Sequence, residues 1–172
     1  MRLTKAQAAE IKSITAQYEQ VIFTGCGSTY YLSLAGAALY QSMTGKTARA
    51  VPASELLLNG STVLSPGTRY LLIAVSRSGT TTETLRAIEK YQREQWGGVI
   101  VINNYETEMT RLGDVRIVIP AGQEESVAQT RSFASMYVAV TALCAIASAR
   151  DDLLQSMAAL PAAGARLMDQ YE

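Results

Sequence analysis

The chain has 172 residues and a mass of 18.5 kDa, which fits one domain with a single core. Lys and Arg together number 15, as do Asp and Glu, so the formal net charge is zero and nothing indicates nucleic acid or a membrane surface as a partner. Histidine is absent, and two cysteines are too few for a disulfide framework or a zinc site. The composition therefore predicts a reduced, cytoplasmic protein without a metal or cofactor, in which any catalysis uses a carboxylate, Lys or Tyr.

Apolar runs and helix-period stretches alternate along the chain. The spacing of apolar residues predicts a leading helix over residues 3–19. Short apolar runs predict five strands, at residues 20–24, 47–51, 70–75, 98–102 and 115–119. Helices are expected at about 28–43, 53–58, 84–95 and 130–149, with turns at 59–61 and 65–67 and a polar loop at 121–129. Residues 152–172 predict a last helix, bent or broken at Pro161 and Gly164.

The predicted strands are continuous apolar runs and not alternating ones, which is typical of a parallel sheet that is covered on both faces. We therefore predict an α/β fold in which a doubly wound, five-stranded parallel sheet is flanked by helices. Residues 1–150 are expected to form this domain, and 151–172 a C-terminal helical connector. The N-terminus does not have the pattern of a signal peptide, and the apolar run at 138–147 is too short to span a membrane.

The stretch after the third predicted strand is rich in hydroxyl groups. Residues 76–82, Ser-Arg-Ser-Gly-Thr-Thr-Thr, precede a helix whose first N–H groups have no backbone partner. Such a loop can bind a phosphate monoester, or it can simply cap the helix. Polar loops also follow the first strand, at 25–29, and the fifth strand, at 121–129. Because all strands of a parallel sheet point the same way, the three loops are expected at one edge, where they could share a ligand.

Other loop motifs fit poorly. Gly25-Cys26-Gly27 begins a dinucleotide fingerprint, but Tyr30 stands in place of the third glycine and the second strand does not end in Asp or Glu. The Gly-Lys-Ser or Gly-Lys-Thr of a nucleotide triphosphate loop is absent. A serine nucleophile elbow is absent too, and a serine triad would lack its histidine.

Four motifs in order along residues 20–150 resemble the sugar-isomerase (SIS) domain: Gly25-Cys26-Gly27-Ser28-Thr29, Ala53-Ser54-Glu55, Ser76-Arg77-Ser78-Gly79-Thr80-Thr81-Thr82-Glu83-Thr84, and Glu124-Glu125-Ser126-Val127-Ala128-Gln129-Thr130-Arg131-Ser132-Phe133. The resemblance is to one half of the tandem isomerase part of glucosamine-6-phosphate synthase and of related sugar-phosphate deaminases and ketose/aldose isomerases.

This resemblance implies a flavodoxin-like sheet and a phosphosugar site. Family members hold the phosphate with the residues that match Ser76, Ser78 and Thr81. Their first loop contacts the sugar or the phosphate, and their third loop lines the sugar. The candidate substrate-binding residues are Ser76, Ser78, Thr81, Ser28, Thr29, Thr80, Gly27, Val127 and Gln129. Arg77 could screen the charge of the phosphate, but the favoured expectation is that it points to solvent or to a partner subunit.

Catalysis by the family requires a base, which in the tandem relatives is a Glu of the second half, assisted by a histidine. Neither is found here, so the catalytic residue stays unknown. We expect the N-terminal half of an isomerase or deaminase acting on a hexose or hexosamine 6-phosphate. One alternative is a complete single-domain homo-oligomer with Glu55, Glu124 or Glu125 as base. Another is a non-catalytic phosphosugar sensor. In each case a homodimer or higher homo-oligomer is expected.

Overall fold

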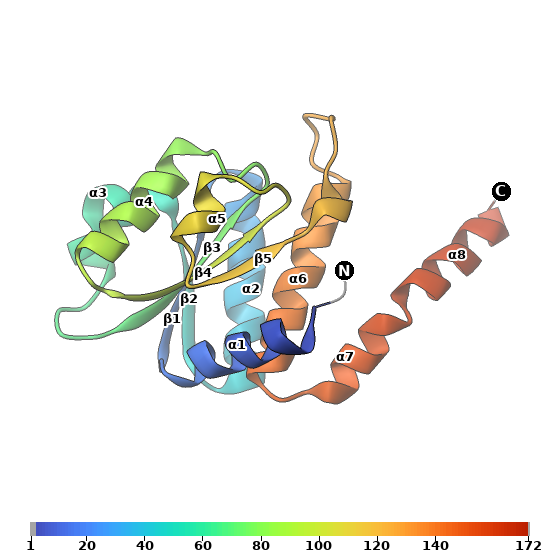
Figure 1. Ribbon diagram of the computed structural model, residues 1–172, viewed down its shortest axis with the longest axis horizontal. Helices are drawn as coiled ribbons and strands as arrows, with labels where there is room; N and C mark the ends of the chain where they lie inside the picture. Colours follow the sequence, from blue (N-terminus) through green and yellow to red (C-terminus); the bar gives the residue numbers. More distant parts are fainter. Residues whose placement is uncertain (1–2, 172) are drawn as a thin grey trace.

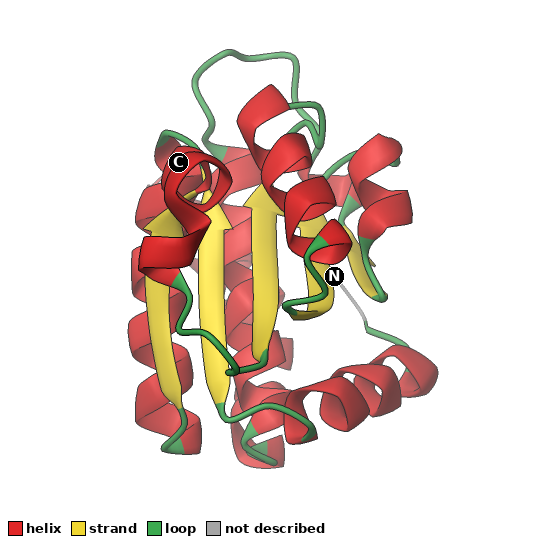
Figure 2. Ribbon diagram, turned by 90° about the vertical axis from the view of Figure 1, so that its left-hand side faces the viewer, coloured by secondary structure: helices red, strands yellow, loops and turns green. Residues whose placement is uncertain are grey.

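A five-stranded parallel sheet forms the centre of the computed structural model, which describes residues 3–171. The strands are β1 (Gln20–Gly25), β2 (Thr47–Pro52), β3 (Tyr70–Ser76), β4 (Gly97–Asn103) and β5 (Val115–Val118). They lie side by side in the order β2-β1-β3-β4-β5, and every neighbouring pair is parallel (Figure 2). The predicted α/β fold is confirmed. Residues 1–2 and 172 of the predicted domain and connector lie outside the described residues.

Helices cover both faces of the sheet (Figure 1). One face carries α1 (Lys5–Ala16), α2 (Ser28–Thr44) and α6 (Arg131–Ala147); the other carries α3 (Ala53–Val63), α4 (Thr82–Arg93) and α5 (Glu108–Leu112). Successive side chains of β3 enter the two cores alternately, with Ile73 in the first and Leu72 in the second. Because β3 is buried along its whole length, its sequence is an unbroken apolar run.

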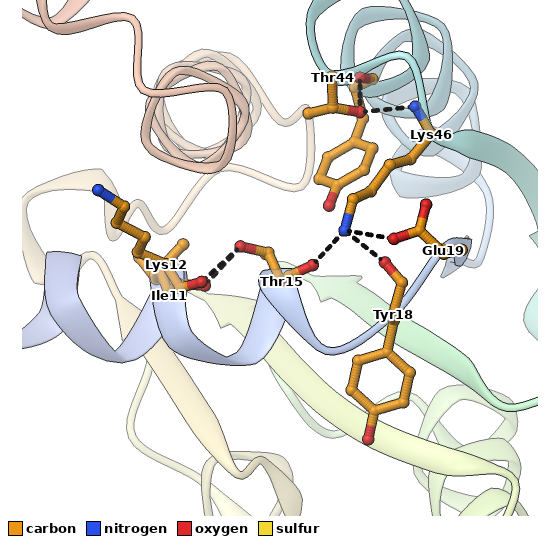
Figure 3. A network of polar contacts seen from close by, with 8 residues as sticks. Ile11, Lys12, Thr15, Tyr18, Glu19, Thr44 and Lys46 are labelled. Atoms are coloured by element: carbon orange, nitrogen blue, oxygen red, sulfur yellow. Dashed lines mark hydrogen bonds and ion pairs between the residues drawn. The ribbon is translucent and has the colours of Figure 1, made fainter.

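Lys46, just before β2, binds the C-terminal end of α1 (Figure 3). The ammonium group of Lys46 donates hydrogen bonds to the carbonyl oxygens of Thr15, at 2.9 Å, and Tyr18, at 2.8 Å. It also pairs with the carboxylate of Glu19 at 3.3 Å. A cation is favourable here, because the last carbonyl groups of a helix lack intrahelical partners. The leading helix is therefore an integral part of the domain.

Two predicted breaks are placed differently by the structure. The predicted turn at 59–61 is wrong, because α3 continues to Val63 with only a kink at Asn59. The last segment consists of α7 (Asp151–Ala158) and α8 (Leu160–Tyr171). The break at Ala159 precedes Pro161, which a first helical turn tolerates. Gly164 lies inside α8, so the predicted break at Gly164 is wrong.

Two short elements were not predicted. Helix α5 follows β4, and the 3-10 helix η1 (Pro120–Gly122) occupies the start of the predicted polar loop. Both are too short to show a helical period in the sequence. Over residues 3–171, the helices are all too short or too polar to cross a lipid bilayer.

Candidate functional site

The candidate site lies where the chain reverses its direction across the sheet. The chain goes from β1 to β2 on one side, and then returns to β3 on the other side of β1. Helices α2 and α4 begin just after these central strands, β1 and β3. Among residues 3–171, no side chain caps the first turn of either helix from its N-cap residue, Gly27 or Thr81. The N-termini of α2 and α4 thus lie at the same edge of the sheet, where the helix dipoles favour an anion. In α2 the N–H groups of Thr29 and Tyr30 already donate to the carbonyl oxygens of Cys26 and Gly27.

The loop after β3 holds its hydroxyl groups in a fixed arrangement. Ser76 is only 2% exposed, and its Oγ accepts a hydrogen bond from the Gly79 N–H at 3.1 Å and lies 3.3 Å from Thr81 Oγ1. The Oγ of Ser78 accepts bonds from the N–H, at 3.2 Å, and the hydroxyl, at 3.0 Å, of Thr80. Within the described residues the Ser78 hydroxyl donates to no acceptor, so its hydrogen is free for a ligand.

The side chains of Thr107 and Asn103, which the sequence analysis did not select, support this loop at Gly79. Gly79 has φ +65°, and its carbonyl oxygen accepts a bond from Thr107 Oγ1 at 3.0 Å. A Cβ atom on Gly79 would collide with Thr107 Oγ1 and lie 2.8 Å from Asn103 Nδ2. The Asn103-Asn104 pair at the end of β4 is the signal that could have identified them, since it marks a fourth polar loop at the same sheet edge.

The first and third loops meet through one hydrogen bond. Ser28 Oγ donates to Gln129 Oε1 at 3.0 Å, although 101 residues separate them. Gly27 precedes this serine at the N-cap of α2, with φ +56°. Thr29 is buried, and its hydroxyl bonds to the backbone N–H and C=O of Cys26. The side chain of Thr29 therefore shapes the turn, while Ser28 and Gln129 join the first loop to the third.

Arg77 joins the second loop to the third. Its Nη1 donates to the carbonyl oxygen of Ser126 at 2.9 Å and makes a longer contact of 3.5 Å with that of Val127. Within the described residues Arg77 therefore binds the main chain of the third loop of the same chain. Val127 itself is 91% exposed. All nine predicted site residues thus lie in three loops at one edge of the sheet, connected by Arg77 and Ser28.

Glu124 caps α6. Its carboxylate accepts hydrogen bonds from the backbone N–H groups of Thr130 (3.1 Å), Arg131 (3.1 Å) and Ser132 (3.0 Å), and from the hydroxyls of Thr130 and Ser132. These bonds, above all those from Ser132, lower the pKa of Glu124 to about 2. A carboxylate that acidic, with its lone pairs occupied, is a poor general base.

The other two acidic candidates also lack the surroundings of a base. Glu55 is exposed in the first turn of α3, and its carboxylate accepts a hydrogen bond from Asn59 Nδ2 at 2.9 Å. Glu125 is exposed and accepts no hydrogen bond from any of residues 3–171. Neither carboxylate lies in the desolvated surroundings that make a carboxyl group an effective general base.

Replacing Glu124 with Gln is expected to change how stability depends on pH. Since the pKa of Glu124 is lower in the folded chain than the ordinary value of 4.5, its contribution is complete above pH 4.5 and is lost as the pH falls toward 2. Glu124→Gln should lower the free energy of unfolding at pH 7 and flatten its decline below pH 4.5. Urea unfolding at a series of pH values measures both effects.

Glu125→Gln is the matched control and should leave the curve unchanged. Asp152, whose pKa is lowered to about 2 by Arg150, supplies part of the remaining slope in both variants. A Glu124→Gln protein with the wild-type pH profile would contradict the capping role.

Solved structures share this fold. Glucosamine-6-phosphate deaminase from Thermotoga maritima aligns with a TM-score of 0.68 at 25% identity, over 84% of this chain and 47% of the deaminase. A protein from Escherichia coli CFT073, solved in complex with a ligand, aligns with a TM-score of 0.71 at 20% identity, over 84% of this chain and 77% of that one. The latter likeness concerns the fold alone.

Sequence comparison gives the same result. Glutamine–fructose-6-phosphate aminotransferase (isomerizing) from Thermococcus kodakarensis is 27% identical over 147 residues, which are 83% of this chain and 24% of the aminotransferase. The chain therefore spans about a quarter of that relative and about half of the deaminase. The profile of the SIS domain matches residues 11–146, which confirms the resemblance seen in the loop motifs: the chain belongs to the SIS domain family, and it is homologous to the domains of phosphosugar isomerases and deaminases.

Proposed function

We propose that the chain binds a hexose or hexosamine 6-phosphate at the sheet edge beyond β1 and β3, as the substrate-binding half of an aldose–ketose isomerase or deaminase. The observation that carries this proposal is that the N-termini of α2 and α4, neither of them capped by the side chain of its N-cap residue, lie at this edge. A phosphate dianion placed there gains from both helix dipoles. The named relatives, which act on sugar phosphates, support the same class of ligand.

Each loop has its own task in this proposal. The hydroxyls of Ser76, Ser78, Thr80 and Thr81 surround the phosphate, and the free hydrogen of Ser78 points to its use as a donor. Ser28, behind Gly27, approaches the sugar from the first loop, and Thr29 holds the turn that positions it through its hydroxyl bonds to the backbone of Cys26. Val127 and Gln129 approach the sugar from the third loop. Phosphate binding then fixes the sugar for a proton transfer between C1 and C2.

The base for that transfer comes from outside residues 3–171 in this proposal. Glu124 is occupied as a cap, and Glu55 and Glu125 are exposed. The partial coverage of the aminotransferase and the deaminase favours a second SIS unit that follows residues 151–172, which remain the proposed connector. A single-domain homo-oligomer is the alternative, which the 77% coverage of the Escherichia coli protein favours. We place either form in the cytoplasm, without a cofactor, as a homodimer or larger assembly.

Thermal unfolding with a panel of hexose 6-phosphates and their 2-amino analogues tests the proposal. A ligand at about 100 times its Kd stabilises the folded state by about 2.7 kcal/mol, which raises the Tm of a chain of this size by about 5–10 °C. The same sugars without phosphate should give no shift.

Ser78→Ala should weaken the binding of the active compound about 10- to 150-fold, because it removes a hydrogen bond to a charged group. Ser28→Ala should have a smaller effect. Ser42→Ala, an exposed position along α2, is the matched control and should bind like wild type. If Ser78→Ala also binds like wild type, the loop is a helix cap and not a phosphate site.

A further inference from the structure

The middle of the third loop has few attachments to the rest of the domain. The loop extends beyond the start of α6, at the top of the view in Figure 1. Its two ends are held by the bonds of Glu124 to the start of α6 and by the bond between Ser28 and Gln129. Between these ends, residues 125–128 are all exposed. A segment that buries no side chain depends on its hydrogen bonds for a defined position.

Arg77 supplies the hydrogen bonds to this middle part. Its Nη1 donates to the carbonyl oxygen of Ser126 at 2.9 Å and lies 3.5 Å from that of Val127. Among residues 3–171, no other group forms a hydrogen bond with residues 125–128. The position of the segment that carries Val127 is therefore set by a single side chain of the second loop.

The main chain of Arg77 is itself fixed by the end of β4. Its carbonyl oxygen accepts a hydrogen bond from the N–H of Asn104 at 3.1 Å. Asn104 is 0% exposed, and its Nδ2 donates to the carbonyl oxygen of Ile119 at 3.2 Å and to Ser135 Oγ at 2.9 Å. The guanidinium group of Arg77 thus extends from a rigid base to a loop segment that lacks support of its own.

No acidic group competes for the guanidinium of Arg77. Among residues 3–171, no carboxylate lies within 4 Å of it, and the acceptors of its Nη1 are neutral carbonyl oxygens. A hydrogen bond from a charged donor is stronger than one between neutral groups. The bond to Ser126 is therefore strong enough to keep an exposed segment in place.

We propose that Arg77 is a positioning residue, which holds the third loop against the sugar while its neighbours Ser76 and Ser78 hold the phosphate. This inference rests on the proposed function. Arg77 acts on the sugar only through the main chain of Ser126 and Val127, so its effect depends on whether the ligand has a sugar ring. Three consecutive residues thereby connect the recognition of the two ends of the ligand.

Binding of two phosphate esters to Arg77→Gln tests this role. The hexose 6-phosphate that binds the wild type most tightly should bind the variant at least about tenfold more weakly, because the loop loses a hydrogen bond from a charged group. Glycerol 3-phosphate, which has no sugar ring, should change less than about twofold. Arg93→Gln is the matched control: Arg93 is 68% exposed at the other end of α4, and this variant should bind both esters like wild type.

Two results of this titration would overturn the proposal. Equal weakening of both esters would mean that Arg77 contacts the phosphate itself. Unchanged binding of both would mean that other groups place the third loop.

Limited proteolysis provides a second measurement, which needs no ligand. A Glu-specific protease should cut after Glu125 at least about tenfold faster in Arg77→Gln than in the wild type, because the segment has to leave its position to enter the protease. Arg93→Gln should be cut at the wild-type rate. An unchanged rate in Arg77→Gln overturns the proposal even if sugar phosphates bind. Faster cutting in a chain that binds no sugar phosphate contradicts the proposed function instead, so the two failures are distinguishable.

Discussion

Gly79→Ala is expected to abolish the stabilisation by a sugar phosphate and to lower the free energy of unfolding by about 2–5 kcal/mol. The left-handed conformation of Gly79 costs any other residue about 1–2 kcal/mol. The new methyl group would in addition collide with Thr107 Oγ1 and press on Asn103 Nδ2, and overpacking of this kind costs about 1–3 kcal/mol. Relief of the collision displaces the N–H groups that precede α4, which removes the anion site.

Gly67→Ala separates these two effects. Gly67 has a similar φ of +76°, but a Cβ atom there would meet nothing within 4 Å among the described residues. This variant should show only the backbone cost and keep the full ligand-induced Tm shift. Urea unfolding and thermal shift with and without ligand measure both quantities. A Gly79→Ala protein that behaves like Gly67→Ala would show that the close packing beneath the loop is unimportant.

Phe23→Ala is expected to cause the largest loss of stability, about 3–5 kcal/mol, which is the range for removing a buried phenylalanine ring. Phe23 lies in β1 with 0% of its surface exposed, and its ring meets that of Tyr40 edge to face at a centroid distance of 6.0 Å. It also contacts α2 at Gly36, where a Cβ atom would lie 3.0 Å from the ring. Alanine would leave a cavity between β1 and α2 that the helix backbone cannot fill.

The second phenylalanine of the chain is the control. Phe133 is partly buried at the margin of the same core, so Phe133→Ala should cost less than half as much. Denaturation in urea gives both values, with unchanged m-values if the unfolded state is unaffected. Equal losses would contradict the central position of Phe23 between the sheet and α2.

The strands could be predicted because each is determined by a short stretch of consecutive residues. Each strand is a run of apolar residues that ends in a turn signal, and all five were found within one or two residues of their predicted bounds. The loops could be predicted as a group, because parallel strands deliver their carboxyl ends to one edge. The break of the last helix was predicted only in part: proline has a local effect at Ala159, whereas the single Gly164 did not interrupt α8.

The connections within the site were not predictable from the sequence, because they join residues far apart in the chain. Arg77 bonds to Ser126 across 49 residues, and Thr107 supports Gly79 across 28. Glu124 is separated from Ser132, in the first turn of α6, by only eight residues, but nothing in the sequence distinguishes its role from that of Glu125. Local patterns identify which residues gather at an edge, and only packing decides which of them bond to one another.

The hydrogen bonds of Glu124 to residues 130–132 join the two ends of the third loop, which affects how far the sequence of this loop can be varied. The carboxylate of Glu124 starts α6 from upstream, so residues 125–129 are not needed to begin the helix. Arg77 donates to a main-chain carbonyl oxygen, a group that every amino acid has. Doubling the length of a flexible loop costs only about 0.6 kcal/mol. This segment can therefore be exchanged or extended in directed evolution while the scaffold beneath it is kept, and under the proposed function it is the place to introduce a new sugar preference.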